Sequence, residues 1–216
     1  ALDMLSCKTL ACFDRGGGSN EGGELDTADG GSGWGLPHGG DGLFAIQRAV
    51  FEDGRVSGPE LLDALRADFV GDDVLRAYLQ SLPKYGADDA AANAMTDRVF
   101  CTFADLLAEH TTPHGGTVVP IILGFVWVVS FGEQVGATPD GRRAGRVLAH
   151  GLSPQSGSAL KGITGAIRSA TALSLSKAGG GSAMMWDLDP AWAEPRVVRP
   201  LLETFVDRGG HIFQGN

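Results

Sequence analysis

The feature that most constrains the fold is a continuous apolar run, TVVPIILGFVWVVSF, from Thr117 to Phe131. Valine, isoleucine and aromatic residues dominate the run, and its polar residues stand at or near its ends. A strand that is buried on both faces of a sheet has this composition, whereas a half-exposed strand alternates apolar and polar residues. The run therefore predicts a central strand of a parallel sheet or of a barrel. Pro120 and Gly124 are unusual inside such a strand and indicate a bend or a close approach of another backbone.

Alternation along this predicted strand places three large side chains on one face, those of Leu123, Phe125 and Trp127. One interpretation is that this face looks inward in a barrel and lines its cavity. The other is that it packs in an ordinary hydrophobic core, which is the commoner place for large apolar side chains. The three residues are candidates for a cavity wall, and the core interpretation is the favoured one.

A tight turn is predicted a few residues further on, in the sequence ATPDGRR that begins at Ala137. Pro139 fixes φ at the second position of a turn, Asp140 can cap the turn with its own carboxylate, and Gly141 tolerates a positive φ. These three residues predict a rigid corner in the chain.

Two arginines, Arg142 and Arg143, directly follow this corner. A fixed guanidinium group suits a carboxylate partner that it can bind with two parallel hydrogen bonds. The partner is either the acid group of a substrate or a structural aspartate of the same protein. The structural interpretation is favoured, because most arginines near tight turns lock a loop to its neighbours. Asp140, Arg142 and Arg143 are therefore candidates for a structural or an anion-binding role.

Amphipathic spacing predicts helices on both sides of these features. Asp41 is expected to cap a helix over residues 42–52, and the residues from Ser57 to Glu60 form a capping box before the next helix. Further helices are predicted at residues 1–12, around 75–82, at 84–109 and around 163–173, and a last helix begins at Pro195 and ends before Gly209. Strands are also predicted at residues 182–188 and 211–214. The fold class that follows is α/β.

Residues 15–42 are rich in glycine. A phosphate-binding loop is excluded there, because the segment has neither a Gly-Lys-Ser/Thr sequence nor a G-x-G-x-x-G sequence between a strand and a helix. A flexible linker is one interpretation of the segment.

Cysteine and histidine spacing predicts no metal site. The chain has three cysteines without metal-ligand spacing, which fits a reducing cytoplasm. Cys12 and Cys101 are assigned structural roles. His110 and His114 have the i, i+4 spacing of a helical metal site, but Pro113 breaks the helix between them and no third ligand is near.

Charge and hydropathy exclude two classes of partner. The net charge is −9 with the acidic residues scattered, which argues against binding to a nucleic-acid backbone. No apolar run approaches the roughly 18 residues of a transmembrane helix. The first residues lack the basic start of a signal peptide, so a cytoplasmic location is expected.

A longer match surrounds the predicted corner. The run GEQVGATPDGRRAG begins at Gly132, and LAHGLSP follows from Leu148 to Pro154. This sequence resembles the pyruvate formate-lyase family of glycyl radical enzymes, whose members carry G-x-x-x-G-A-T-P-D-G-R-x-A-G and then P-L-A-D-G-x-S-P. Val147 stands where the family has proline, and His150 stands where it has aspartate.

The resemblance implies an α/β barrel with surrounding helices, of which this chain is a part that is incomplete at both ends. It implies that residues 1–216 are a partial domain of this type. The family stores an unpaired electron on a backbone glycine in an R-V-x-G-Y-x-A loop and passes it to a cysteine in a G-C-x-E motif. Neither motif occurs in the sequence, so the glycyl radical domain is expected to be absent, no catalytic residue is assigned and the chain alone is expected to be inactive.

The resemblance also implies the cofactor and partners of the full-length protein. The cofactor is the glycyl radical, which an activating enzyme with S-adenosylmethionine and an iron–sulfur cluster installs. The partners are that enzyme, a small-molecule substrate and a second copy in a homodimer.

Substrate and branch stay open from the sequence. The A-T-P-D-G-R form is more typical of the dehydratase and decarboxylase branches than of formate C-acetyltransferase itself, as far as the resemblance goes. A different class of function is a stand-alone α/β module that binds a small anion through Arg142 and Arg143. A helical scaffold without a ligand is a third interpretation, which the long apolar run disfavours.

Overall fold

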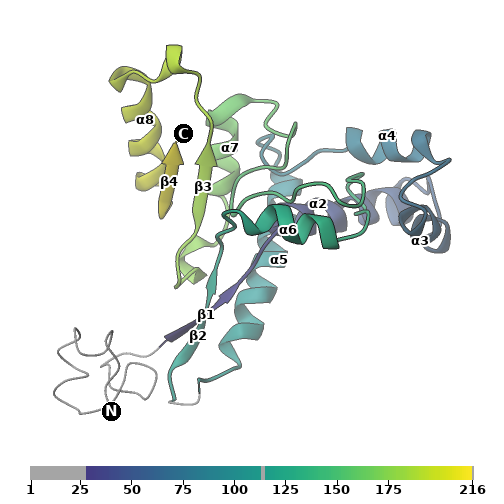
Figure 1. Cartoon of the computed structure of the whole chain (residues 1–216), viewed down its shortest axis with the longest axis horizontal. Helices are drawn as coiled ribbons and strands as arrows, with labels where there is room; N and C mark the ends of the chain where they lie inside the picture. Colours follow the sequence, from purple (N-terminus) through teal and green to yellow (C-terminus); the bar gives the residue numbers. More distant parts are fainter. Residues whose placement is uncertain (1–27, 113–114, 216) are drawn as a thin grey trace.

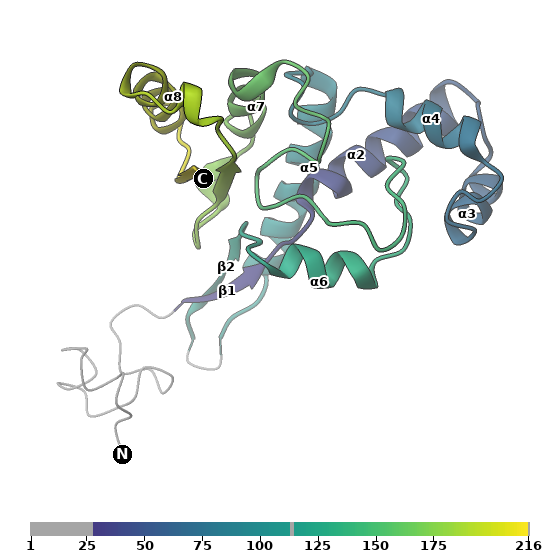
Figure 2. The same ribbon diagram turned by 45° about the horizontal axis from the view of Figure 1, so that its top comes forward.

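The computed structural model describes residues 28–112 and 115–215. The helix predicted over residues 1–12 lies outside the described residues, as do Cys12 and His114. Figures 1 and 2 show helices α3 (Gly58–Arg66) and α4 (Asp73–Ser81) at one end of the molecule, and helix α8 (Pro195–Asp207) with the last strands at the other. No helix of the described residues is both long and apolar enough to span a bilayer.

Four short strands in the described residues form two parallel pairs. The first pair is β1 (Ala28–Ser32) with β2 (Thr117–Ile121), and the second is β3 (Ala183–Trp186) with β4 (Ile212–Gly215). A parallel bridge between Ile122 and Ser182 joins the two pairs, where the Ile122 amide donates to the Gly181 carbonyl at 2.9 Å. The order in space is therefore β1-β2-β3-β4 with all strands parallel, and the carboxyl ends of β1 and β2 lie beside the amino ends of β3 and β4 (Figure 1). The predicted parallel arrangement and the strands near 182–188 and 211–214 are confirmed.

The strand expected over Thr117 to Phe131 is much shorter than predicted. β2 ends at Ile121, Phe125 has a φ of +45°, and helix α6 (Trp127–Gln134) follows. The alternation that placed Leu123, Phe125 and Trp127 on one face is therefore wrong. Phe125 and Trp127 are 53% and 55% exposed, while Leu123 is partly buried. The physical reason is that an apolar run of this length is compatible with both a strand and a helix, and only packing decides between them.

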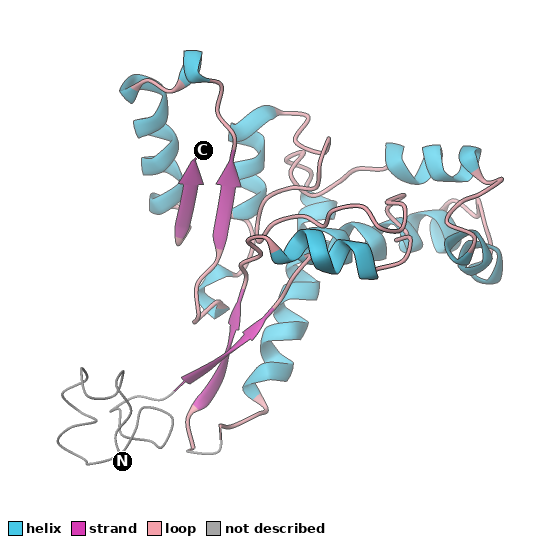
Figure 3. Cartoon of the chain, viewed as in Figure 1, coloured by secondary structure: helices cyan, strands magenta, loops and turns pink. Residues whose placement is uncertain are grey.

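The remaining helices follow the predicted periodicity with shifted ends, except for two 3-10 turns that the sequence does not predict. They are α2 (Leu36–Ile46), the π-helical turn η3 (Gln47–Glu52), α5 (Ala90–Ala108), α7 (Gly162–Ala170), and the 3-10 turns η4 (Leu175–Lys177) and η5 (Pro190–Trp192). The capping box that begins α3 is present, with Ser57 and Glu60 bonded in both directions. Figure 3 shows the long irregular segment, drawn in pink, that connects α6 to α7.

Two helix starts differ from the prediction. α2 begins at Leu36, so Asp41 lies inside the helix and does not cap it. α5 begins at Ala90, because the Asp89 carboxylate accepts from the amides of Ala91 and Ala92. The early start of α2 depends on contact with α5: a Cβ on Gly40 would lie 2.6 Å from the Cα of Thr96. Part of the glycine-rich segment is therefore strand and helix, not linker.

Two hydrophobic cores hold these elements together. The larger core joins the strands to α5, α7 and α8, and its largest buried members are Tyr85, Phe100, Ile122, Leu152, Ile167, Met184 and Phe205. The smaller core lies where α2 and η3 meet α3 and α4, and it contains Ala45, Ala49, Leu61, Ala64, Phe69, Leu79 and Leu82. The predicted corner lies between these two cores.

Candidate functional site

The corner is a hydrogen-bonded turn with the predicted residue roles. The Gly141 amide donates to the Thr138 carbonyl at 3.0 Å, and the Thr138 amide donates to the Arg142 carbonyl at 2.9 Å. Gly141 has a φ of +90°, and a Cβ there would lie 2.5 Å from the Gln80 side chain on α4. The Asp140 carboxylate accepts from the Thr138 hydroxyl, and Asp140 is only 1% exposed. The corner is therefore buried against its surroundings.

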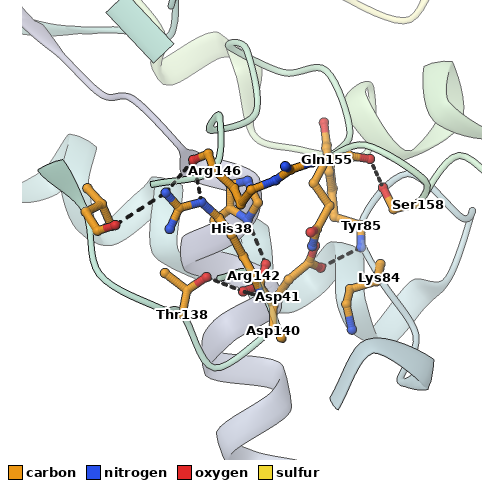
Figure 4. A network of polar contacts seen from close by, with 12 residues as sticks. His38, Asp41, Lys84, Tyr85, Thr138, Asp140, Arg142, Arg146, Gln155 and Ser158 are labelled. Atoms are coloured by element: carbon orange, nitrogen blue, oxygen red, sulfur yellow. Dashed lines mark hydrogen bonds and ion pairs between the residues drawn. The ribbon is translucent and has the colours of Figure 1, made fainter. Parts of the chain in front are cut away.

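His38 on α2 binds the carboxylate of this corner. Its Nδ1 lies 2.7 Å from Oδ2 of Asp140, and the residue is 7% exposed (Figure 4). Burial alone would raise the pKa of Asp140, but the hydrogen bonds from His38 and Thr138 hold that pKa below its usual value. An ionised Asp140 accepts a hydrogen bond from Nδ1–H of His38, which in a neutral imidazole ring leaves Nε2 as the acceptor. No described group bonds to this buried Nε2.

A second buried carboxylate, Asp41, lies one turn further along α2. It accepts from the Tyr85 amide at 2.7 Å and from the Gln155 side-chain amide at 2.5 Å. Burial raises the pKa of Asp41 to about 6, against the opposing effect of these two hydrogen bonds. The hydroxyl of Tyr85 in turn donates to the Leu152 carbonyl at 2.8 Å. Asp41 thereby connects α2, the link between α4 and α5, and the segment after the corner.

The side chain of Arg142 donates all of its described hydrogen bonds to backbone carbonyls. Its side chain reaches the carbonyls of Gly136 and Gly132 at 2.8 Å each, and Nε reaches that of Arg146 at 2.9 Å. Arg142 is 6% exposed. A buried guanidinium group with its donors bonded in this way fixes the loop between α6 and the corner.

Arg143 joins the corner to the α3–α4 end of the molecule. It donates to the Asp68 carbonyl at 2.6 Å and to the Asp73 carboxylate at 3.1 Å, and the neighbouring Ala144 amide donates to Asp68 Oδ1 at 2.7 Å. Arg76 on α4 adds a bond from Nε to the Gly141 carbonyl at 3.0 Å. These contacts place Asp140, Arg142 and Arg143 in one network, and Asp73 is the aspartate partner of Arg143.

The cavity-wall candidates lie apart from this network, at the loop after β2. The Phe125 amide donates to Nε2 of His150 at 2.6 Å, and the two rings meet edge to face. Burial lowers the pKa of His150, which favours the neutral ring that such an acceptor needs. His150 is one of the two departures from the family pattern, and it holds the backbone of Phe125 in its positive φ.

Sequence reasoning assigned no role to His38 or His150, and it assigned Asp41 only the cap of a helix. Cys101 is half-buried on α5 and makes no hydrogen bond to a histidine or carboxylate among the described residues. No cluster of three metal-ligating side chains occurs in the part of the chain that the structure describes. The network can therefore hold loops and bind a polar ligand, but it offers no thiol nucleophile within the described residues.

A family model described as pyruvate formate lyase-like matches residues 2–132. The chain belongs to the pyruvate formate lyase-like family. It is 32% identical over 227 residues to the probable dehydratase YbiW of Escherichia coli K12, an alignment that covers 97% of this chain and 28% of that protein. It is also 37% identical over 127 residues to isethionate sulfite-lyase of Bilophila wadsworthia, covering 57% of this chain and 15% of that protein.

Solved structures show the same relationship. Hydroxyproline dehydratase from Clostridioides difficile superposes with a TM-score of 0.91 at 26% identity, covering 98% of this chain and 28% of that one. A glycyl radical enzyme from Archaeoglobus fulgidus gives a TM-score of 0.91 at 29% identity, covering 99% and 28%. The expected partial α/β fold of the glycyl radical enzyme type is confirmed. The chain spans about 28% of the length of these relatives.

These findings also bear on the alternative class of function. A stand-alone module that binds an anion through Arg142 and Arg143 is not supported, because the chain belongs to an enzyme family. The donors of Arg142 are bonded to carbonyls, and Arg143 is paired with Asp73.

Proposed function

We propose that this chain forms one wall of the barrel of a glycyl radical enzyme that eliminates water, or another small leaving group, from a small organic substrate. The observation that carries the proposal is the superposition of 98% of the chain on hydroxyproline dehydratase with a TM-score of 0.91. The named relatives are dehydratases and a sulfite-lyase, so elimination is favoured over the acetyltransferase reaction.

The radical glycine does not fit any residue of this chain. The sequence lacks the R-V-x-G-Y-x-A loop, and Cys101 has no base beside it among the described residues. The glycyl radical, in the longer enzyme, would supply hydrogen abstraction from the substrate. The activating enzyme, a homodimer and a cytoplasmic location are further proposals that come with this class of enzyme.

The residues of this chain would supply part of the substrate enclosure. Active sites of parallel α/β folds lie at the carboxyl ends of the strands. Leu123, Phe125 and Trp127 directly follow the carboxyl end of β2, which ends at Ile121. The partly exposed rings at this edge support a role in the cavity wall, although they reach it from a loop and a helix start and not from a strand face.

The corner would keep this edge in place. The Leu152 amide donates to the Ala183 carbonyl at 2.8 Å, and the Ser153 hydroxyl accepts from the Met185 amide at 2.8 Å. The segment after the corner is thereby bonded to β3, while Asp41 bonds it to α2 and Tyr85 bonds it to the link between α4 and α5. A rigid enclosure of this kind orients a substrate and excludes water from a reactive intermediate.

The test is to express the open reading frame that contains these 216 codons, with its activating enzyme, under anaerobic conditions. A glycyl radical signal in electron paramagnetic resonance is expected, with loss of water or sulfite from a diol, 4-hydroxyproline or isethionate. Formation of acetyl-CoA and formate from pyruvate and CoA, without any elimination, would contradict the proposal.

The cavity-wall role needs its own variants. Phe125→Ala should raise KM or lower kcat about tenfold or more while the radical signal stays intact, because substrate contacts are lost. Val126→Ala is the matched control, since this neighbour is 76% exposed and follows Phe125 in the same loop. Equal effects of the two substitutions would remove Phe125 from the cavity wall.

A further inference from the structure

A polar cavity of about 530 Å³ lies beside the corner, between α4 and the segment that follows the corner. Four arginines line it, together with His38 and two glutamines; the arginines are Arg76, Arg142, Arg143 and Arg146. No aspartate or glutamate lines the cavity within the described residues. Four like charges around one space repel one another. This arrangement is unexpected in a chain whose net charge is −9.

Two of the four arginines are already committed to the fold. Arg142 donates to backbone carbonyls, and Arg143 donates to Asp68 and Asp73. Arg76 uses only Nε, on the Gly141 carbonyl, and its terminal amino groups have no partner among the described residues. The guanidinium group of Arg146 likewise has no partner in the described part of the chain. Donors for a ligand therefore remain on Arg76 and Arg146.

His38 adds a hydrogen-bond acceptor to the same cavity, whereas the arginines supply only donors. It is 7% exposed, and its Nε2 is buried without a hydrogen bond to any described residue. The bond from Nδ1 to Asp140 leaves Nε2 as the acceptor on the other side of the neutral ring, and Figure 4 shows the ring in the same network as Arg142 and Arg146. A buried acceptor without a donor is costly, so a donor is expected at this position.

We propose that this cavity binds a small free oxyanion that keeps a proton on one oxygen, such as hydrogen phosphate. Arg76 and Arg146 would bond its charged oxygens, and Nε2 of His38 would accept its O–H group. Arg142 and Arg143 hold the shape of the cavity and do not contact the ligand. The requirement for a proton on the ligand separates phosphate from sulfate, because sulfate carries no proton near neutral pH.

The test measures binding of inorganic phosphate and of sulfate to the full 216-residue chain by calorimetry at pH 7.5. Phosphate should bind about tenfold more tightly than sulfate, because a hydrogen bond to a charged group is worth about that factor. His38→Asn keeps a donor for Asp140 near the position of Nδ1 but removes the Nε2 acceptor. It should lower the affinity for phosphate about tenfold and leave that for sulfate unchanged.

Two arginine variants complete the design. Arg146→Ala should weaken both anions about tenfold, because it removes a charged donor at an exposed residue that the fold does not need. Arg66→Ala is the matched control, since this arginine on α3 pairs only with the exposed Asp63, and it should change neither affinity. The melting temperature of each variant without ligand separates a binding effect from unfolding.

Three results would overturn the proposal. Phosphate at millimolar concentration could fail to bind, which would leave water as the occupant of the cavity. Phosphate and sulfate could bind equally, which would remove the acceptor role of His38. Arg66→Ala could weaken binding as much as Arg146→Ala, which would show a general charge effect. None of these measurements depends on radical chemistry, so they stand apart from the test of the proposed function.

Discussion

Replacing Asp41 by asparagine should remove a pH dependence of stability that the natural chain shows between about pH 4 and pH 6. Burial is the largest cause of the raised pKa of Asp41, which is about 6 in the folded chain against 3.8 for an ordinary aspartate. The Tyr85 amide and the Gln155 side chain bond to the carboxylate and oppose this shift without cancelling it. The folded chain therefore binds the Asp41 proton more tightly than the unfolded chain does.

The sign and size of the effect follow from that difference. Below about pH 4, Asp41 is protonated in both states and contributes no pH dependence. As the pH rises from about 4 to about 6, the unfolded chain has lost this proton while the folded chain retains it, so the free energy of unfolding falls. Each pKa unit corresponds to about 1.4 kcal/mol, so the shift from 3.8 to about 6 corresponds to about 3 kcal/mol.

The assay is urea unfolding followed by tryptophan fluorescence at several pH values from 4 to 7. The informative quantity is the difference in free energy of unfolding between the natural chain and Asp41→Asn, because the other carboxylates titrate in both proteins. The pKa of Asp140 is shifted downward, so its stabilisation is present at higher pH and is lost below pH 3.8, outside this window. Asp207→Asn, at an exposed residue of α8, is the control. A difference for Asp41→Asn that stays constant from pH 4 to 7 would refute the reasoning.

Two further predictions use matched pairs of positions and the same urea assay. Gly86→Ala should destabilise the chain by about 3 kcal/mol, because Gly86 has a φ of +96° and a Cβ there would lie 2.3 Å from the Pro154 ring. The control is Gly71→Ala, which should cost about 1 kcal/mol, because Gly71 has a similar φ of +87° but open space around it. Equal costs would show that the contact with Pro154 is irrelevant. Phe205→Ala should lower the free energy of unfolding by about 3–5 kcal/mol, because the ring is fully buried. The control is Phe51→Ala, at a ring that is 79% exposed, which should change the free energy of unfolding by less than about 0.5 kcal/mol. A loss below about 1 kcal/mol at Phe205 would contradict the packing of the larger core.

Features with strong local rules could be predicted from the sequence. The Pro139-Asp140-Gly141 corner follows from turn preferences that depend on single residues, and the structure has the expected bonds and positive φ. The capping box at Ser57 is similarly local, because its two partners lie three residues apart. The family resemblance also needed only a contiguous segment.

Features that depend on tertiary contacts could not be predicted. β1 has the sequence ADGGS, which favours a loop, yet a Cβ on Gly30 would lie 2.0 Å from the Ile121 side chain of the neighbouring strand. The position of Asp41 inside α2 depends on partners at Tyr85 and Gln155, distant along the chain. The paired status of Arg143 likewise depends on Asp73, 70 residues away. The two residues of each of these contacts lie far apart in the sequence, so local residue preferences alone cannot predict the contacts.

The long-range bonds of the corner explain why one short turn matters for the whole section of the barrel. Through Arg143 and Arg76, the corner is bonded to the α3–α4 end, which belongs to the smaller core. Through His38, it is bonded to α2, and the segment that follows it reaches β3 at Leu152, in the larger core. Within the described residues, the outer edges of β1 and β4 have no strand partner, so backbone pairing alone does not hold this part of the sheet in shape. Polar bonds that join both cores supply the missing constraint.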